Sequence, residues 1–235
     1  MDYFRNIVLV AAIAGVLAGL GMTVAQQLTT VPLILKAEVY EEQGTTAAHD
    51  YGDAAAQPAA HDHDEGWQPA DGFERTAFSA LANIVTGVGF ALLLVAASEL
   101  AGGITSWRQG VFWGLAGFAV FTLVPSLGLP PELPAMPAAE LGARQLWWVA
   151  TALSAAGALA LIFYARSPLA IVAAIALLVA PHLIGAPEPA SYDTPIPEGL
   201  HHSFVVAVVL TALLFWVLLG ALAGRFRERF IRASG

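Results

Sequence analysis

The stretch that decides the fold is NIVLVAAIAGVLAGLGMTVAQQLTTVPLIL, residues Asn6 to Leu35, in which thirty consecutive residues carry no charge. The hydrocarbon core of a bilayer is about 30 Å thick and is crossed by roughly 20 apolar helical residues. A soluble helix would also need a polar stripe along one face, and this stretch has none. It therefore predicts a membrane-spanning helix.

Five more charge-free runs of similar length follow along the chain. They are Thr76 to Ser98, Gln109 to Pro131, Gln145 to Ala165, Ser167 to Pro187 and Gly199 to Gly224. Helices satisfy their own backbone hydrogen bonds in lipid, so each run predicts a helix. Together the runs predict an all-α integral membrane bundle of about six transmembrane helices, built as a single domain over residues 1–235.

Two of the runs leave the helix count open. The fifth run is interrupted by Pro168 and Pro181, so it is re-entrant in one interpretation. The first run contains Thr23-Val24-Ala25, which is similar to the cleavage site of a secretory signal peptide. Either change would reduce the count to five. Against cleavage, Gly15 and Gly19 form a GxxxG face of the kind that packs two membrane helices together.

The composition excludes several classes of function. The formal charge of −8 disfavours a nucleic-acid partner, which would require a basic surface. The chain has no cysteine, which excludes disulfides and thiolate metal sites. The sole lysine, Lys36, follows a leucine, so no Walker A loop exists. GxSxG and HExxH motifs are also absent, and we expect no enzymatic activity.

The distribution of charge predicts the topology. With a cytoplasmic N-terminus, the inner segments carry Arg5, Arg108, Arg166, Arg225, Arg227, Arg229 and Arg232, and the outer segments carry Lys36, Arg75 and Arg144. This asymmetry obeys the positive-inside rule and predicts a multi-pass protein of a bacterial inner membrane with both termini cytoplasmic. Most acidic residues and all six histidines then lie on or near the outer face. The first outer loop, residues 36–75, is too poor in aliphatic residues to fold alone, and we expect partial disorder.

Two groups of outer residues are candidate metal ligands. The first is His61, Asp62, His63 and Asp64 in the outer loop, and the second is His182, Glu188, His201 and His202 at the mouths of the fifth and sixth runs. Imidazole and carboxylate groups suit nickel, cobalt, copper and zinc. The alternative for the loop is a solvated acidic segment with incidental histidines. For the second group it is a set of interfacial side chains.

Polar residues and glycine pairs in or beside the predicted spans are consistent with two roles, a transport pathway or packing between helices. The polar ones are Gln26, Gln27, Asn83 and Glu99, and the glycine pairs are Gly110 with Gly114 and Gly220 with Gly224. Intramembrane polar groups often mark a pathway. Hydrogen bonding between helices is the alternative for Gln26, Gln27 and Asn83. Glu99 is near the inner end of its run, so a place among the lipid headgroups also explains it.

The longer motifs are similar to those of a known family. They are FRNIVLVAAIAGVLAGL (4–20), PLILKAEVYE (32–41), WQPADGFERTAFSALANIVTGVGFALLL (67–94), GLPPELP (128–134), RQLWW (144–148) and PHLIGAP (181–187). In this order and spacing, the chain resembles the CbtA family of bacterial membrane proteins, proposed to be cobalt transporter subunits. The resemblance implies cobalt uptake linked to vitamin B12 biosynthesis, beside a small single-helix CbtB-like partner. It implies Co²⁺ as the transported ion, with no tightly bound cofactor.

The sequence thus predicts a lipid-embedded subunit that captures Co²⁺ on its acidic outer face and conducts it across the inner membrane. One alternative is a membrane scaffold that does not transport, or an accessory protein that buffers metal. Another is a permease for Ni²⁺ or Zn²⁺, because these ions share ligand types with cobalt.

Overall fold

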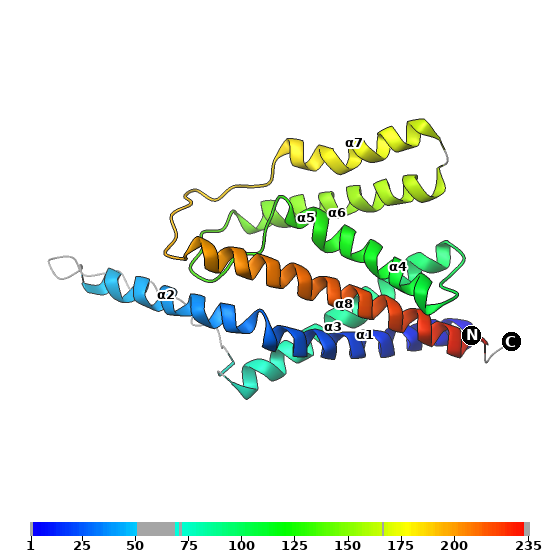
Figure 1. The fold of residues 1–235 in the computed structure, drawn as a ribbon, viewed down its shortest axis with the longest axis horizontal. Helices are drawn as coiled ribbons and strands as arrows, with labels where there is room; N and C mark the ends of the chain where they lie inside the picture. The colour runs from blue at the N-terminus through cyan, green and yellow to red at the C-terminus, as the bar shows by residue number, and fades with distance from the viewer. Residues whose placement is uncertain (1, 51–68, 71, 166, 233–235) are drawn as a thin grey trace.

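The computed structural model describes residues 2–50, 69–70, 72–165 and 167–232, and within these ranges the chain is helical without β-strands. The elements are α1 (Asp2–Leu28), α2 (Val31–Asp50), α3 (Phe73–Leu100), α4 (Trp107–Phe118), the π-helix η1 (Ala119–Leu123), α5 (Val124–Ser126), α6 (Leu141–Tyr164), α7 (Pro168–Ile184) and α8 (Glu198–Arg232). The start of α1 and the end of α8 lie at the same end of the molecule (Figure 1). The predicted all-α bundle is confirmed.

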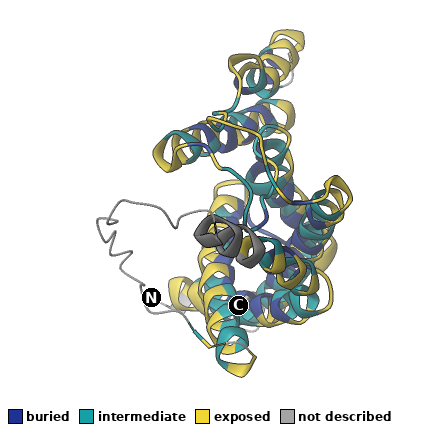
Figure 2. Cartoon of the chain, turned by 90° about the vertical axis from the view of Figure 1, so that its left-hand side faces the viewer, coloured by how far each residue is buried: buried dark blue, intermediate teal, exposed yellow. Residues whose placement is uncertain are grey.

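Five segments of the described chain are long and apolar enough to cross a membrane. They are Tyr3–Leu28, Phe73–Leu100, Trp107–Ser126, Leu141–Tyr164 and Glu198–Phe230. Figure 2 shows buried residues where helices meet and exposed residues along their outward faces. Many of the exposed residues are large and apolar, such as Phe112, Leu153 and Val172. An outward apolar surface of this extent suits contact with lipid chains.

The fifth predicted run forms α7, which has only 17 residues. Pro168 occupies its first turn, where a missing N–H costs nothing, and the Ser167 hydroxyl accepts a hydrogen bond from the Ala170 N–H at 3.2 Å. Pro181 lies inside the helix near its end, and Gly185 follows with a φ of 90°. In Figure 1, α7 runs back antiparallel to α6, which brings the chain to the end where α8 begins.

The first predicted run differs from expectation because it is divided between two helices. The Thr29 and Thr30 hydroxyls donate to the Ala25 and Gln26 carbonyl oxygens, and such side-chain bonds compete with continuation of the helix. Pro32 then disfavours helical geometry in the residue before it. The second helix, α2, also includes the first fifteen residues (36–50) of the segment predicted to be an outer loop.

The start of α2 is helical because it packs against the rest of the protein. Ala37 is fully buried in a cluster with Leu133, Ile196 and Phe204, which come from the connections before α6 and α8 and from α8 itself. Lysine, glutamate and alanine residues in this part of the chain are also good helix formers. These contacts join segments far apart in the chain, so composition alone could not reveal them.

Close glycine contacts join the central helices, as the GxxxG patterns predicted. A Cβ atom on Gly19 of α1 would lie 2.6 Å from the Asn83 carbonyl oxygen of α3, far inside ordinary contact distance. Gly224 of α8 would place a Cβ 2.6 Å from the Ser106 carbonyl oxygen, at the start of α4. Such approaches are available only to glycine, and they let membrane helices gain van der Waals packing.

An aromatic cluster fills the centre of the bundle, where α4 changes to the π-helix η1. The rings of Phe121 and Trp216 stack at 5.6 Å with an interplanar angle of 6°. Phe90 of α3 and Trp148 of α6 pack against this pair. The Trp216 indole N–H donates to the Thr122 hydroxyl at 3.3 Å. Pro125, the second residue after η1, lacks an N–H, and the wider π-turn lets the helix continue past it.

Candidate functional site

The two ends of the bundle differ in charge. The termini end is formed by the start of α1, the α3–α4 connection and the end of α8, and the opposite end carries α2 and the connections before α6 and α8 (Figure 1). Among described side chains, the opposite end has Glu38, Glu41, Glu74, Glu132, Glu140, Glu188, Asp193 and Glu198, and the termini end has Glu99 and Glu228. Five of the described basic residues, Arg5, Arg108, Arg225, Arg227 and Arg229, belong to the termini end, and three, Lys36, Arg75 and Arg144, belong to the opposite end. The fold therefore segregates the charges as the sequence predicted.

His182 lies at the end of α7 against Trp147 of α6. The two rings meet edge to face with centroids 5.7 Å apart, and the Trp147 indole N–H donates to the Pro181 carbonyl oxygen at 3.2 Å. The His182 Nε2 atom is buried and has no hydrogen-bond partner. A buried polar nitrogen without a partner is unfavourable, so this atom is a candidate for a further ligand.

The other members of the second predicted group lie apart. The His201 Nε2 atom is 3.1 Å from the Pro131 carbonyl oxygen and forms a hydrogen bond with it, so this ring ties α8 to the connection before α6. His202 and Glu188 are exposed. Desolvation of the phenol, and then the charge and hydrogen bond of Glu188, raise the pKa of Tyr192 above its usual value.

In the part of the chain that the structure describes, three or more histidine and acidic side chains nowhere gather into a group that could hold a metal ion. His182, Glu188, His201 and His202 share one end of the molecule without forming such a group. The other predicted ligands, His61, Asp62, His63 and Asp64, lie outside the described residues. A metal-binding role for either group stays a prediction.

A cavity of about 510 Å³ opens beside the start of α8. It is lined by Lys36, Val39 and Tyr40 of α2 and by Leu200 of α8. Its lining contains an ammonium group and no carboxylate, which makes it unsuited to a metal cation.

The polar residues inside the spans form hydrogen bonds between helices. The Asn83 amide of α3 donates to the Gln26 amide oxygen at 2.6 Å and to the Thr23 hydroxyl at 3.1 Å, both on α1. The Gln27 amide donates to the Thr76 hydroxyl at 3.2 Å. These contacts form one ladder between α1 and α3, in the half nearer the opposite end. The structural alternative predicted for these residues is therefore observed.

Ion pairs lie at both ends of the bundle. At the opposite end, Arg75 of α3 pairs with Glu38 of α2, and Arg144 of α6 pairs with Glu132 at 2.9 Å. Glu140 caps α6 by accepting hydrogen bonds from the Gly142 and Ala143 N–H groups. These bonds hold the pKa of the Glu140 carboxyl below its usual value.

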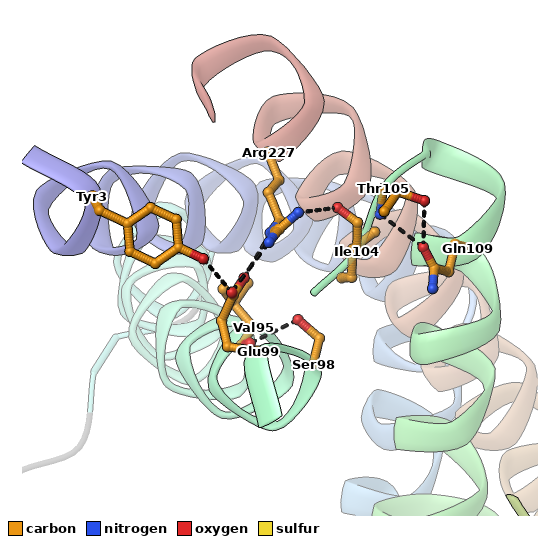
Figure 3. Close-up of polar contacts among 8 residues, drawn as sticks. All are labelled: Tyr3, Val95, Ser98, Glu99, Ile104, Thr105, Gln109 and Arg227. Carbon is orange, nitrogen blue, oxygen red and sulfur yellow. Dashed lines mark hydrogen bonds and ion pairs between the residues drawn. The ribbon is translucent and has the colours of Figure 1, made fainter. Parts of the chain in front are cut away.

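The termini end contains a polar cluster that sequence reasoning missed (Figure 3). Arg227 of α8 binds the Glu99 carboxylate of α3 in bidentate fashion, at 2.6 Å through Nε and 3.1 Å through Nη2. Tyr3 of α1 donates to the same carboxylate, and Arg227 donates to the Ile104 carbonyl oxygen. Sequence analysis singled out Glu99 and Arg227 separately, and their distance along the chain concealed the pair. The one sequence signal near this cluster is the Gly102-Gly103 pair, which is typical of a turn and follows closely after Glu99.

The fold and these contacts define a multi-pass α-helical membrane protein with oppositely charged ends. Residues 4–228 match the family model described as "Probable cobalt transporter subunit (CbtA)", and the chain belongs to this family. No curated protein and no solved structure matches the chain. The family description is that of a transporter subunit, which implies further subunits and a transport role rather than an enzymatic one.

Proposed function

We propose that this protein is the membrane subunit of a cobalt uptake system, and that it captures Co²⁺ at the opposite end and conducts it toward the termini end. The observation that carries the proposal is the concentration of acidic side chains at one end, taken with membership of a cobalt transporter family. A negative surface raises the local concentration of cations and speeds their capture. In this proposal the opposite end faces the outside of a bacterial inner membrane, and both termini are cytoplasmic.

The capture residues in this proposal are the loop ligands His61, Asp62, His63 and Asp64, followed by His182, Glu188, His201 and His202 near the membrane. The buried, unpartnered Nε2 atom of His182 supports a ligand role for that residue. The observed His201 contact to Pro131 must open before His201 can bind a metal ion through Nε2. The link to vitamin B12 biosynthesis and the single-helix CbtB-like partner rest on the family resemblance.

Cobalt accumulation by cells that express the protein with its partner subunit tests the capture site. We expect His182→Ala, His201→Ala and His202→Ala together to reduce accumulation, because they remove every described imidazole. Ser191→Ala with Ser203→Ala is the matched control at the same end and should preserve it. Accumulation that survives the triple histidine change would show that these histidines are not the entry site.

Transport by purified protein in liposomes separates a conduit from a scaffold. We expect Co²⁺ uptake that Ni²⁺ and Zn²⁺ inhibit to different degrees. Binding of Co²⁺ without uptake, measured with the partner subunit present, would instead support a scaffold or metal-buffering protein. Equal or stronger transport of Ni²⁺ or Zn²⁺ would reassign the cargo.

The orientation in the membrane can be tested with single cysteines, because the chain contains none. Ala190 and Ala101 are exposed at the opposite end and the termini end, respectively. An impermeant maleimide applied to intact cells should label Ala190→Cys and spare Ala101→Cys. The reverse pattern would place the acidic end in the cytoplasm and contradict the proposed uptake.

A further inference from the structure

Three oxygen atoms at the termini end surround one guanidinium group. They are both carboxylate oxygens of Glu99 and the carbonyl oxygen of Ile104, and each lies between 2.5 and 3.1 Å from an Arg227 nitrogen. The Tyr3 hydroxyl lies 2.5 Å from one of the Glu99 oxygens. Figure 3 shows these groups converging from α1, α3, α8 and the α3–α4 connection.

The Glu99–Arg227 pair is mostly shielded from solvent, whereas Tyr3 beside it is 53% exposed. The Arg227 side chain is 11% exposed and the Glu99 side chain 21%. Gly103 adopts a φ of 78°, and a Cβ atom at this position would overlap the guanidinium of Arg227. The Gly103 N–H also donates to the Ser98 carbonyl oxygen at 2.7 Å, which fixes the turn against the end of α3. The chain therefore makes room here for one positive group.

From these contacts we infer that Glu99, the Ile104 carbonyl and Tyr3 form an exit site for the transported divalent cation, which Arg227 occupies as a tethered cation when the site is closed. Carboxylate and carbonyl oxygens are ligands for divalent cations, and the Tyr3 hydroxyl is a third oxygen beside them. Arg227 and a divalent cation require the same carboxylate, so binding of one must weaken binding of the other. This inference rests on the proposed function, because the exit site is the place where the transported cation would be released.

The ligand types of the exit site suit release better than capture. It offers oxygen atoms only, whereas the proposed capture residues include imidazoles, which Co²⁺ binds well. An arginine that returns to Glu99 would displace the ion and restore the closed arrangement.

Direct Co²⁺ binding to the purified protein tests the exit site without reference to transport. Arg227→Gln removes the competing charge, and we expect it to tighten Co²⁺ binding at one site by about tenfold or more. Adding Glu99→Gln to that variant should abolish the gain. Calorimetric titration reports both, and the absorption spectrum of the bound Co²⁺ should indicate oxygen ligands. The inference is overturned if Arg227→Gln and the double variant bind Co²⁺ identically.

Arg227→Gln leaves the Glu99 carboxylate unpaired, so misfolding of this variant would obscure its effect on Co²⁺ binding. A steric variant provides a second test. Gly103→Ala should push the guanidinium out and also tighten Co²⁺ binding, whereas Gly102→Ala is its matched control. Gly102 has a φ of 90°, so the control carries comparable backbone strain, but its Cβ would meet nothing within 4 Å. Equal Co²⁺ binding by these two variants would contradict the inference.

Failure of the exit site and failure of the proposed function give different results. If cells accumulate cobalt and Glu99→Gln leaves both accumulation and Co²⁺ binding unchanged, only the exit site is wrong. If Arg227→Gln gains the Glu99-dependent Co²⁺ site but no variant or parent protein transports cobalt, the proposed function fails and the site remains.

Discussion

The crossing of α1 and α3 offers a sharp test of the packing that holds the bundle together. Gly87 of α3 faces Gly15 of α1, and a Cβ atom on Gly87 would lie 2.5 Å from the Gly15 carbonyl oxygen. Ordinary contact begins at 3.4 Å, so Gly87→Ala requires the two backbones to separate by roughly 0.9 Å. Neither atom belongs to a flexible side chain, and the helices themselves must move.

The expected free-energy change combines two opposing effects. Overpacking costs about 1–3 kcal/mol, and replacing glycine by alanine inside a helix gains about 1 kcal/mol. Gly89→Ala is the matched control, because Gly89 lies two residues away in α3 and its Cβ would meet nothing within 4 Å. The helical gain is common to both variants. Gly87→Ala should therefore be less stable than Gly89→Ala by about 1–3 kcal/mol.

Unfolding in mixed detergent micelles, with SDS as the denaturant, measures this difference. Tryptophan fluorescence is a suitable probe because Trp216 belongs to the central aromatic cluster. Both variants should unfold in one transition, with that of Gly87→Ala shifted to lower SDS. If Gly87→Ala were as stable as Gly89→Ala, the close approach of α1 and α3 would be refuted as a source of stability.

Three further predictions concern polar contacts. The folded-state pKa of Glu140 is depressed, so its carboxylate stabilises the fold above the unfolded-state pKa and loses this effect as the pH falls through the folded-state value. Thermal unfolding should show Glu140→Gln less stable than the parent at neutral pH, with the difference vanishing in acid. Asn83→Leu should cost about 1 kcal/mol in the SDS titration, because Gln26 loses its partner within the membrane. Glu132→Gln should cost less than about 1 kcal/mol in the same titration, since its pair with Arg144 is partly exposed.

The membrane bundle could be predicted from the sequence because the length of an uncharged run depends only on consecutive residues and not on tertiary contacts. The same holds for the glycine faces: Gly15 and Gly19 are spaced to share one helix face, and the structure places them against α3. The division of the first run was harder to predict, because it depends on threonine hydroxyls that bond back to the helix. Helical order at the start of α2 depends on Ala37 packing against residues far along the chain.

The candidate site was predicted less completely, for a physical reason. Residue type identifies a histidine as a potential ligand, but its partners depend on tertiary contacts such as those of His182 with Trp147 and of His201 with Pro131. The Glu99–Arg227 pair is a still stronger case, because the two residues are 128 positions apart in the chain. Charge patterning placed Arg227 in a basic tail, and only the fold brings it to the carboxylate.

The short helix α7 has a consequence for the surrounding lipid. Its 17 residues span roughly 25 Å at 1.5 Å per residue, which is about 5 Å less than a typical hydrocarbon core. Because α7 packs mainly on α6 and exposes apolar residues such as Leu169 and Ile175, the mismatch falls directly on the acyl chains beside it. We expect the bilayer to become thinner along this edge of the protein, which is one way in which a membrane accommodates a short span.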